Sequence, residues 1–296
     1  MHYYLSAGKR IKKIFSDFSP DLVIGTGGYV TGTVLKTAIK CGIKTALHES
    51  NSLPGVSVKM LAPKADLVML GTEDAKKHLG ECKKCVVTGN PLRNNIPIEE
   101  KSAARKRLGL PDCLTILSAG GSQGASRLNE AVVQLLAYEQ KKGNINHIHG
   151  YGKHGRDTFM QSLADNGVDA GNPHFIIKEY IDNMYTCMCA SDLIITRAGA
   201  MTLTEIMAIG RASVLIPYPY AAENHQYYNA LTLQNANAGR IIDDKELTGS
   251  VLIDTVNRLA DDPELLRLMG ENAAKLSKRD AAGKILREIT ELMGIK

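Results

Sequence analysis

Short apolar segments rich in β-branched residues recur along the chain, and most are followed by a glycine-containing turn and a helical pattern. In the first third, strands are expected at 21–24, 45–47, 66–70 and 85–88. The pattern then restarts, with strands expected at 114–117, 145–148, 175–177, 193–195 and 214–216, and helices from about 248 to 293. Strands that alternate with helices favour a parallel sheet covered on both faces. The sequence therefore predicts an α/β fold of two doubly wound, Rossmann-like domains, with a ligand cleft between them.

The strand–helix alternation is interrupted where Pro91, Pro97 and two asparagines precede a charged stretch. Proline and asparagine favour turns and linkers over regular elements. A chain of 296 residues is also long enough for two domains. The predicted organisation is a first domain at 1–93, a linker at 94–100, a second domain at 101–275 and a C-terminal helix at 276–296 that packs back toward the first domain.

Composition limits the partners that the chain is expected to have. The net charge of +5 suits nucleotide diphosphates or an acidic membrane surface and does not by itself indicate nucleic acid. Cys82 and Cys85 have the spacing of half a zinc site, but no second pair follows, so no metal is expected. The six cysteines are expected to be reduced thiols of a cytoplasmic protein. No apolar run reaches the roughly 18 residues of a spanning helix.

The first residues have helical rather than leader-like spacing, with aromatic, aliphatic and basic side chains interleaved up to Phe18. One interpretation is a helix that lies on an anionic membrane surface. Its candidate contact residues are Tyr4, Leu5, Lys9, Arg10, Lys12 and Lys13. The alternative is that the apolar face packs on its own domain and the lysines are solvated, and Ile14 and Phe18 are expected to be core residues. Both interpretations stay open at this point.

A glycine-rich turn at 118–125 follows one expected strand and precedes a helix. Glycines there let backbone N–H groups approach an anion, and the N-terminus of a helix favours negative charge. Ser122 can add a hydroxyl hydrogen bond to a phosphate. The alternative is an ordinary tight turn with an N-cap serine.

A second turn of this kind spans 196–205, with a helix expected from about Ala200 and Glu205 expected in its first turn. A carboxylate there either stabilises the helix dipole or accepts hydrogen bonds from two ribose hydroxyls. A third polar cluster, at 223–229, contains Gln226 and Asn229, whose amides suit sugar hydroxyls. A capped surface helix is the alternative for this cluster.

In the first half, the segment at 25–32 and the pair His48 and Glu49 with Asn51 follow expected strands. The carboxyl ends of parallel strands meet at one sheet edge, so these residues are also expected there. His48 and Glu49 are the only candidates for catalytic residues, and the catalytic base stays unassigned.

Taken together and in this order, these motifs resemble the MurG family, the UDP-N-acetylglucosamine:lipid I N-acetylglucosaminyltransferases of peptidoglycan synthesis. The segments that show the resemblance are 25–32, 48–51, 89–93, 120–125, 197–205 and 224–226. The resemblance implies a GT-B fold and inverting transfer of N-acetylglucosamine from UDP-N-acetylglucosamine to the 4-hydroxyl of N-acetylmuramic acid in lipid I, giving lipid II. It also implies no cofactor and no metal, and a peripheral location at the cytoplasmic face of the membrane.

The resemblance also implies a role for individual residues. Ser122 and the backbone at Ala200, Met201 and Thr202, with Leu203 and Thr204 beside them, would hold the diphosphate, and Glu205 the ribose. The backbone of Ile181 would read the uracil and Tyr180 would stack nearby. Arg93 would face the nucleotide, and Gln226 and Asn51 would hold sugar hydroxyls.

One departure from the family pattern concerns the start of the chain. The family opens with a strand and a glycine-rich loop that contains a histidine, and this sequence has no such segment. At roughly 30 residues per unit, about two βαβ units are expected to be missing. The first domain is therefore expected to be incomplete, and the chain alone to transfer little sugar. The alternatives are a UDP-sugar epimerase of the same fold and a non-catalytic UDP-sugar-binding fragment or half-subunit.

Overall fold

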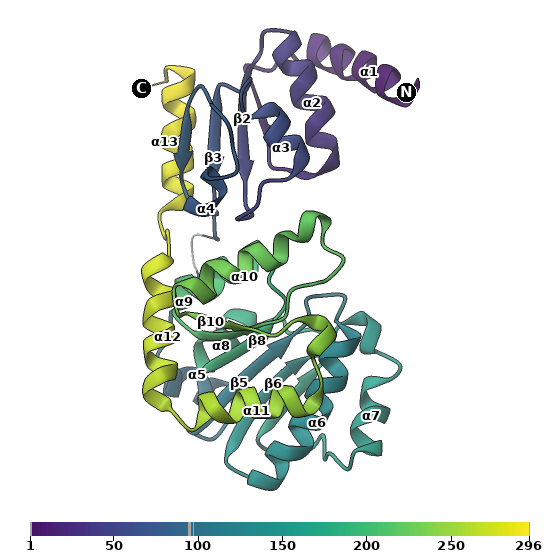
Figure 1. Ribbon diagram of the computed structural model, residues 1–296, viewed down its shortest axis with the longest axis vertical. Helices are drawn as coiled ribbons and strands as arrows, with labels where there is room; N and C mark the ends of the chain where they lie inside the picture. Colours follow the sequence, from purple (N-terminus) through teal and green to yellow (C-terminus); the bar gives the residue numbers. More distant parts are fainter. Residues whose placement is uncertain (1, 94–95, 97, 296) are drawn as a thin grey trace. The chain divides into compact units, whose positions relative to one another are not determined.

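The computed structural model describes residues 2–93, 96 and 98–295, with side chains from residue 7 onward. The chain forms two compact units. The first consists of Met1–Leu92, Tyr220–Asn229 and Lys278–Lys296, and the second of Arg93–Pro219 and Ala230–Ser277. Each unit contains its own parallel sheet (Figure 1). Residues 94, 95 and 97 of the expected linker lie outside the described residues.

The first unit has four parallel strands in the order β1-β2-β3-β4. The strands are β1 (Leu22–Gly25), β2 (Lys44–Glu49), β3 (Leu67–Leu70) and β4 (Cys85–Val87). The helices are α1 (His2–Phe18), α2 (Gly28–Lys40), α3 (Val56–Leu61), α4 (Glu73–Lys76) and α13 (Ala281–Met293). The unit also includes the 3₁₀ turn η2 (Ala222–Asn224) and the start of α10 (His225–Asn235).

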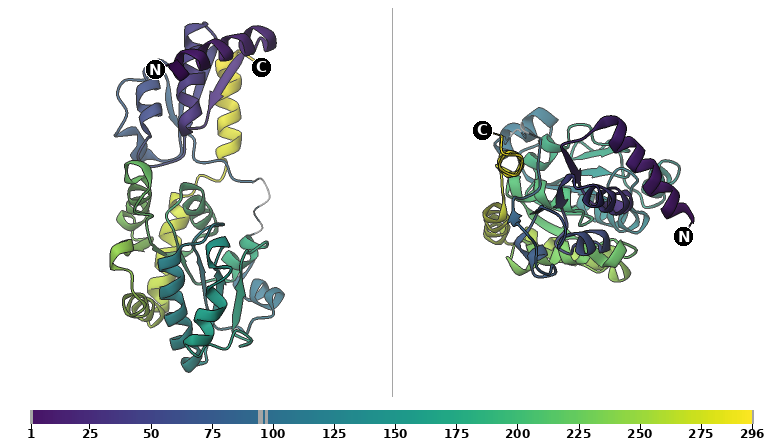
Figure 2. Two further views of the ribbon diagram at one scale, coloured as in Figure 1. Left: turned by 90° about the vertical axis from the view of Figure 1, so that its right-hand side faces the viewer. Right: turned by 90° about the horizontal axis from the view of Figure 1, so that it is seen from above.

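Helices cover both faces of this first sheet. On one face, Leu35 of α2 and Leu61 of α3 pack against Leu47 and its neighbours. On the other face, Ile285 and Ile289 of α13 pack against the strands, and Figure 2 shows this C-terminal helix running beside the sheet. Helix α1 packs on α2. Residues far apart in sequence thus share one core.

The second unit has six parallel strands in the order β10-β9-β8-β5-β6-β7. The strands are β5 (Leu114–Ala119), β6 (Ile145–Gly150), β7 (Phe175–Lys178), β8 (Leu193–Thr196), β9 (Ala212–Leu215) and β10 (Gly239–Ile241). The helices are α5 (Lys101–Leu108), α6 (Ser126–Lys142), α7 (Phe159–Asp165), α8 (Met184–Ala190), α9 (Ala200–Ile209), most of α10, α11 (Gly249–Ala260) and α12 (Pro263–Leu276), with 3₁₀ turns η1 (Lys153–Gly155) and η3 (Asp244–Glu246).

Two clusters of buried apolar side chains lie on opposite faces of this sheet. Leu128 of α6 and Leu252 of α11 belong to one cluster, and Leu203 of α9 and Leu233 of α10 belong to the other. Burial on both faces explains why the strands read as continuous apolar runs, as parallel strands usually do. All nine expected strands are found. The short edge strand β10 was not expected, and α2 begins at Gly28 rather than near residue 31.

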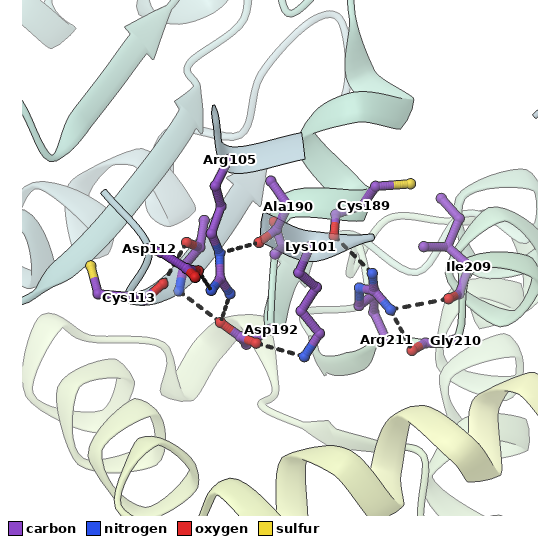
Figure 3. Close-up of polar contacts among 12 residues, drawn as sticks. Lys101, Arg105, Asp112, Cys113, Cys189, Ala190, Asp192, Ile209, Gly210 and Arg211 are labelled. Carbon is purple, nitrogen blue, oxygen red and sulfur yellow. Dashed lines mark hydrogen bonds and ion pairs between the residues drawn. The ribbon is translucent and has the colours of Figure 1, made fainter. Parts of the chain in front are cut away.

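A network of ion pairs and hydrogen bonds lies at the amino-terminal edge of the second sheet (Figure 3). Arg105 of α5 donates to Asp192 Oδ2 at 2.5 Å and to Ala190 O at 3.0 Å. Asp192 also accepts from the Thr115 backbone N at 2.9 Å and pairs with Lys101 Nζ at 2.7 Å. The network therefore ties α5 to the starts of β5 and β8, at the edge of the sheet opposite the glycine-rich turns.

Candidate functional site

A pocket of about 360 Å³ opens at the carboxyl edge of the second sheet. Its walls include the last residues of β5 and β6, Ala119 and Gly150, and the segment directly after β7. The lining residues are Arg93, Ala119, Gly121, Ser122, Gly150, Glu179, Tyr180, Ile181, Asp182, Met184, Tyr185 and Glu205. In open parallel sheets, ligands bind at this edge. The structure thus brings together five of the residues that the sequence singled out, namely Arg93, Ser122, Tyr180, Ile181 and Glu205.

The glycine-rich turn forms one wall of the pocket and leads into α6. Gly121 and Gly124 have φ angles of +86° and +84°, which favour glycine. A Cβ on Gly124 would lie 2.3 Å from the carbonyl oxygen of Tyr151, so no side chain fits there. The residue before α6 is Ala125, which makes no side-chain cap, so the N-cap role considered for Ser122 is wrong. Instead, Ser122 lines the pocket close to the N-terminus of a 17-residue helix, a favourable place for an anion.

Glu205 faces the pocket from α9. Because α9 begins at Ala200, Glu205 lies in the second helical turn, and the expectation of a first-turn position was wrong. A charge–helix-dipole interaction falls off within the first turn, so it is a poor account of this carboxylate. Burial raises the pKa of Glu205, while a hydrogen bond from Tyr185 and the charge of Arg93 oppose that rise. The site thus holds a half-buried carboxylate beside one hydroxyl and one guanidinium.

Tyr185 is a pocket residue that the sequence analysis missed. Its hydroxyl donates to Glu205 Oε1 at 2.9 Å. Burial raises the pKa of Tyr185, and the carboxylate of Glu205 raises it further. The only signal in the sequence was its place four residues after Ile181, in the segment that follows an expected strand.

The other residues of the second turn are divided between pocket and core. Thr202 and Glu205 line a smaller adjoining pocket of about 70 Å³. Leu203 and Thr204 are buried, and Thr204 Oγ1 donates to Ala200 O at 2.8 Å. Neither pocket is lined by Ala200, Met201, Leu203 or Thr204 within the part of the chain that the structure describes.

Tyr180 and Ile181 contribute to the pocket in different ways. The Tyr180 ring is 59% exposed, so its face is available for stacking. Ile181 also lines the pocket, and its side chain is buried in the core. The uracil-reading and stacking roles of the two residues stay predictions from the family resemblance.

His48 and Glu49 are the last two residues of β2, and Asn51 lies in the hydrogen-bonded loop that follows. Glu49 is buried, and its Oε1 accepts from the backbone N and Nδ2 of Asn51 at 2.9 and 3.0 Å. Its Oε2 accepts from the backbone N of Gly55 at 3.0 Å. His48 is buried as well, with Nε2 donating to Gly89 O at 3.1 Å, and burial lowers its pKa. Glu49 thus orders the loop that contains Asn51, whereas His48 connects the end of β2 to the segment after β4.

The amide cluster of α10 continues this network within the first unit. Asn229 Nδ2 donates to Asn51 Oδ1 at 3.1 Å, and Asn229 Oδ1 accepts from the Ser52 backbone N at 2.8 Å. Gln226 lies one helical turn earlier in α10. Asn51, Gln226 and Asn229 thus belong to one unit, while Ser122 and Glu205 belong to the other.

Metal-binding clusters and membrane-spanning helices are both absent from the described residues. In residues 2–93, 96 and 98–295 there is no group of three or more His, Cys, Asp or Glu side chains placed to hold a metal ion. Within the same part of the chain, no helix combines the length and the apolar character needed to cross a bilayer. The six cysteines are all free thiols, Cys82 and Cys85 included.

Two family models match the chain. Residues 115–285 match the glycosyltransferase family 28 C-terminal domain, and residues 3–70 match the glycosyltransferase family 28 N-terminal domain. The first segment covers the six-stranded sheet except for the first residue of β5, and the second contains β1, β2 and β3 of the four-stranded sheet.

Known relatives extend the match across nearly the whole chain. A protein of Desulforamulus reducens named UDP-N-acetylglucosamine–N-acetylmuramyl-(pentapeptide) pyrophosphoryl-undecaprenol N-acetylglucosamine transferase is 38% identical over 282 residues, covering 95% of this chain and 76% of its own length. The crystal structure of Acinetobacter baumannii MurG has a TM-score of 0.80 at 27% identity, over 97% of this chain and 78% of that protein.

A structure of a putative UDP-N-acetylglucosamine 2-epimerase from Listeria monocytogenes is also similar, with a TM-score of 0.71 at 15% identity over 97% of this chain and 78% of that protein. Similarity at this identity reflects a shared fold alone. The expected GT-B fold class is therefore confirmed, while the choice between transfer and epimerisation depends on the sequence relatives. The chain belongs to glycosyltransferase family 28.

Proposed function

We propose that this chain is an inverting glycosyltransferase that moves N-acetylglucosamine from UDP-N-acetylglucosamine to the 4-hydroxyl of N-acetylmuramic acid in lipid I, forming lipid II in peptidoglycan synthesis. The name of the 38% identical relative supports this substrate pair. The observation that carries the proposal is the pocket of the second unit, which combines an anion-suited turn, an exposed aromatic ring and a half-buried carboxylate. These groups suit a diphosphate, a base and a ribose.

In this proposal the diphosphate binds at the glycine-rich turn. Ser122 donates its hydroxyl beside the N-terminus of α6, and from the first turn of α9 Thr202, which lines the adjoining pocket, contributes its backbone N–H. When the sugar is transferred, charge builds up on the departing UDP, and these fixed dipoles stabilise it in place of a metal ion. Arg93, which lines the same pocket, adds a full positive charge.

The remaining roles follow from position and exposure. Glu205 accepts hydrogen bonds from the ribose, the backbone of Ile181 reads the uracil edge, and Tyr180 stacks beside it. In the first unit, Asn51 and Gln226 hold sugar hydroxyls. Glu49 orders the Asn51 loop and His48 connects β2 to the segment after β4, and we assign the role of catalytic base to neither of them.

Replacing Glu205 with alanine should weaken UDP binding by about 1–3 kcal/mol, because ribose hydroxyls lose a charged acceptor. Isothermal titration calorimetry with UDP measures this loss directly. Glu264→Ala is the matched control, since this exposed glutamate on α12 pairs only with the neighbouring Arg267 in the described part of the chain. Unchanged UDP affinity in Glu205→Ala would remove Glu205 from the ribose site.

The reaction class is tested by following UDP-N-acetylglucosamine with and without a lipid I analogue. A transferase forms a disaccharide product and releases UDP only when the acceptor is present. An epimerase changes the sugar of UDP-N-acetylglucosamine without any acceptor. Acceptor-independent turnover by the chain would therefore replace the proposed reaction with the epimerase alternative.

We further propose that α1 places the chain at the cytoplasmic face of an anionic membrane. Ile14 and Phe18, expected in the core, are instead 59% and 77% exposed, so that expectation was wrong. Burial of the Ile14 and Phe18 side chains would need another helix or strand packed against that face of α1. Exposed lysines of α1 also line a pocket of about 410 Å³. Its lining includes Lys9 and Lys12 of α1 and Lys36 and Lys40 of α2. The side chains of Tyr4 and Leu5 lie outside the described residues.

Apolar side chains can enter the headgroup boundary while basic groups meet anionic lipid, and each basic residue contributes about 1 kcal/mol. Changing Lys9, Arg10, Lys12 and Lys13 to glutamine should therefore abolish most binding to phosphatidylglycerol vesicles in co-sedimentation. Binding of the parent chain should weaken as salt is raised.

The matched control also replaces four basic residues with glutamine, at exposed sites of the second unit, namely Lys106, Lys141, Lys245 and Lys275. It should sediment like the parent chain. If the α1 variant also sediments like the parent, the membrane role of α1 is wrong. If both variants lose binding equally, attraction depends on total charge rather than on α1.

A further inference from the structure

The Tyr185 hydroxyl is hydrogen-bonded to the Glu205 carboxylate, which faces the pocket of the second unit. The hydroxyl donates to Glu205 Oε1 at 2.9 Å, joining α8 to α9 across the wall of the pocket. Among the described residues, Tyr185 is the only side chain that donates a hydrogen bond to this carboxylate, and Oε2 accepts from none. One carboxylate oxygen is thus anchored and the other is left for a ligand.

A carboxylate at this position needs such an anchor. Glu205 is on a flexible side chain, and an unanchored carboxylate must lose rotamer freedom when it binds a sugar diol. A donor that fixes one oxygen beforehand removes part of that cost, which is the general benefit of preorganisation. Arg93 cannot replace this contact, because its influence on Glu205 is a charge effect without a hydrogen bond in the described residues.

Anchoring also affects the charge state of Glu205. Burial raises the pKa of this carboxyl, and the hydrogen bond from Tyr185 is the larger of the two influences that oppose the rise. A carboxylate accepts hydrogen bonds at both oxygens, whereas a carboxylic acid uses one oxygen as a donor. Removing the Tyr185 hydroxyl would therefore leave more of Glu205 protonated in mildly acidic solution, where it accepts ribose hydroxyls poorly.

We propose that Tyr185 is a positioning residue that orients Glu205 toward the 2′- and 3′-hydroxyls of the bound nucleotide and thereby makes the pocket selective for ribonucleotides over 2′-deoxyribonucleotides. This inference rests on the proposed binding of UDP in the same pocket. Tyr185 thereby joins the residues of the UDP site, and the site prefers a ribose to a 2′-deoxyribose. Tyr185 itself need not touch the ligand.

Tyr185→Phe tests the proposal, because it keeps the ring and removes only the hydroxyl. UDP affinity should fall about 5- to 20-fold at pH 7.5, less than the full loss of a hydrogen bond to a charged group, because Tyr185 acts on the ligand only through Glu205. Affinity for 2′-deoxy-UDP should fall less, so the ratio of the two affinities should shrink toward the ratio in Glu205→Gln. Calorimetry with both nucleotides gives these ratios.

A pH series separates positioning from a general structural effect. Because the variant lacks the hydrogen bond that lowers the pKa of Glu205, its UDP affinity should begin to fall at a higher pH than that of the parent chain between pH 8 and pH 5. The terminal phosphate of UDP titrates in the same range, but it does so equally with both proteins and cancels in the comparison. A purely structural loss would lower affinity by the same factor at every pH.

Tyr138→Phe is the matched control, since it removes a hydroxyl that accepts from Asn257 Nδ2 at 2.9 Å elsewhere in the same unit. It should change neither the nucleotide ratio nor the pH profile. If the parent chain binds no UDP, the proposed function fails. If the parent binds UDP and Tyr185→Phe keeps its nucleotide ratio and pH profile, only the role of Tyr185 is overturned.

Discussion

Asp192→Ala is expected to destabilise the second unit by about 3–5 kcal/mol, the usual result of removing one partner of a buried ion pair. The Arg105 guanidinium would stay in the protein interior without its main counter-charge, and the backbone N of Thr115 would lose its acceptor (Figure 3). Urea denaturation followed by circular dichroism measures the loss. Because the network lies at the amino-terminal edge of the sheet, UDP affinity of the folded fraction should not change.

Asp112→Ala is the matched control for this prediction. Asp112 pairs with the same arginine at 2.7 Å, but its side chain is 67% exposed, so its removal should cost less than about 1 kcal/mol. Replacing Arg105 and Asp192 together, with methionine and alanine, removes the stranded charge and should be less damaging than Asp192→Ala alone. Equal losses from Asp112→Ala and Asp192→Ala would show that burial does not set the strength of this network.

The order of strands and helices was predictable because each buried parallel strand is a continuous apolar run bounded by a glycine turn. Strand β10 was missed because it has only three residues and lies at the edge of the sheet, where one of them, Arg240, is exposed. Such a segment lacks both the length and the apolar character that mark a buried strand. Its pairing with β9 depends on tertiary contacts that no local pattern encodes.

Surface exposure was harder to predict than helix formation. The spacing of Ile14 and Phe18 correctly indicates one face of α1, but periodicity cannot show whether another element covers that face. The helix start at Ala200 was predicted correctly, but Glu205 is the sixth residue of that helix. With 3.6 residues per turn it lies in the second turn, so the error was in the position along the helix and not in the helix boundary.

The pocket could be predicted only in part. Ser122 and Glu205 were found because each lies in a segment that follows a strand, at the sheet edge where ligands bind, whereas Tyr180 was named only through the family resemblance. Tyr185 was missed because its importance comes from a partner 20 residues away on another helix. A hydrogen bond between two helices depends on how they pack. A single sequence contains no direct signal of the distance between Tyr185 and Glu205.

Acidification is expected to weaken the second unit through His149, which lies fully buried in β6. Three side chains form a hydrogen-bonded chain with it. His147 Nδ1 and Glu139 Oε2 are 2.7 Å apart, His147 Nε2 and Ser118 Oγ 2.6 Å, and Ser118 Oγ and His149 Nδ1 2.7 Å. If His147 is neutral and donates to the carboxylate, its Nε2 accepts from Ser118, and Ser118 accepts from His149 Nδ1. This order leaves His149 Nε2 unprotonated, and Nε2 is the atom with no partner among the described residues.

Protonating His149 would place a charge and an unpaired N–H in the core, beside the Phe159 ring at 4.7 Å. Burial, and next to it the neighbouring His147, lower the pKa of His149 from 6.5 to about 3. The unfolded chain binds the proton below pH 6.5, whereas the folded chain does not until about pH 3. Stability from this group is therefore complete above pH 6.5 and is lost as the pH falls, by about 1.4 kcal/mol per unit and about 5 kcal/mol in all.

His149→Gln removes this titration, so the slope of unfolding free energy against pH between 6 and 4 should become shallower than in the parent by about 1.4 kcal/mol per unit. Urea denaturation at a series of pH values gives both slopes, and the carboxylates that also titrate there are common to both proteins. His154→Gln, which removes an exposed imidazole from the adjacent turn, should keep the parent slope. Parallel slopes for His149→Gln and the parent would mean that water or a local rearrangement lets the folded chain protonate His149 near its ordinary pKa.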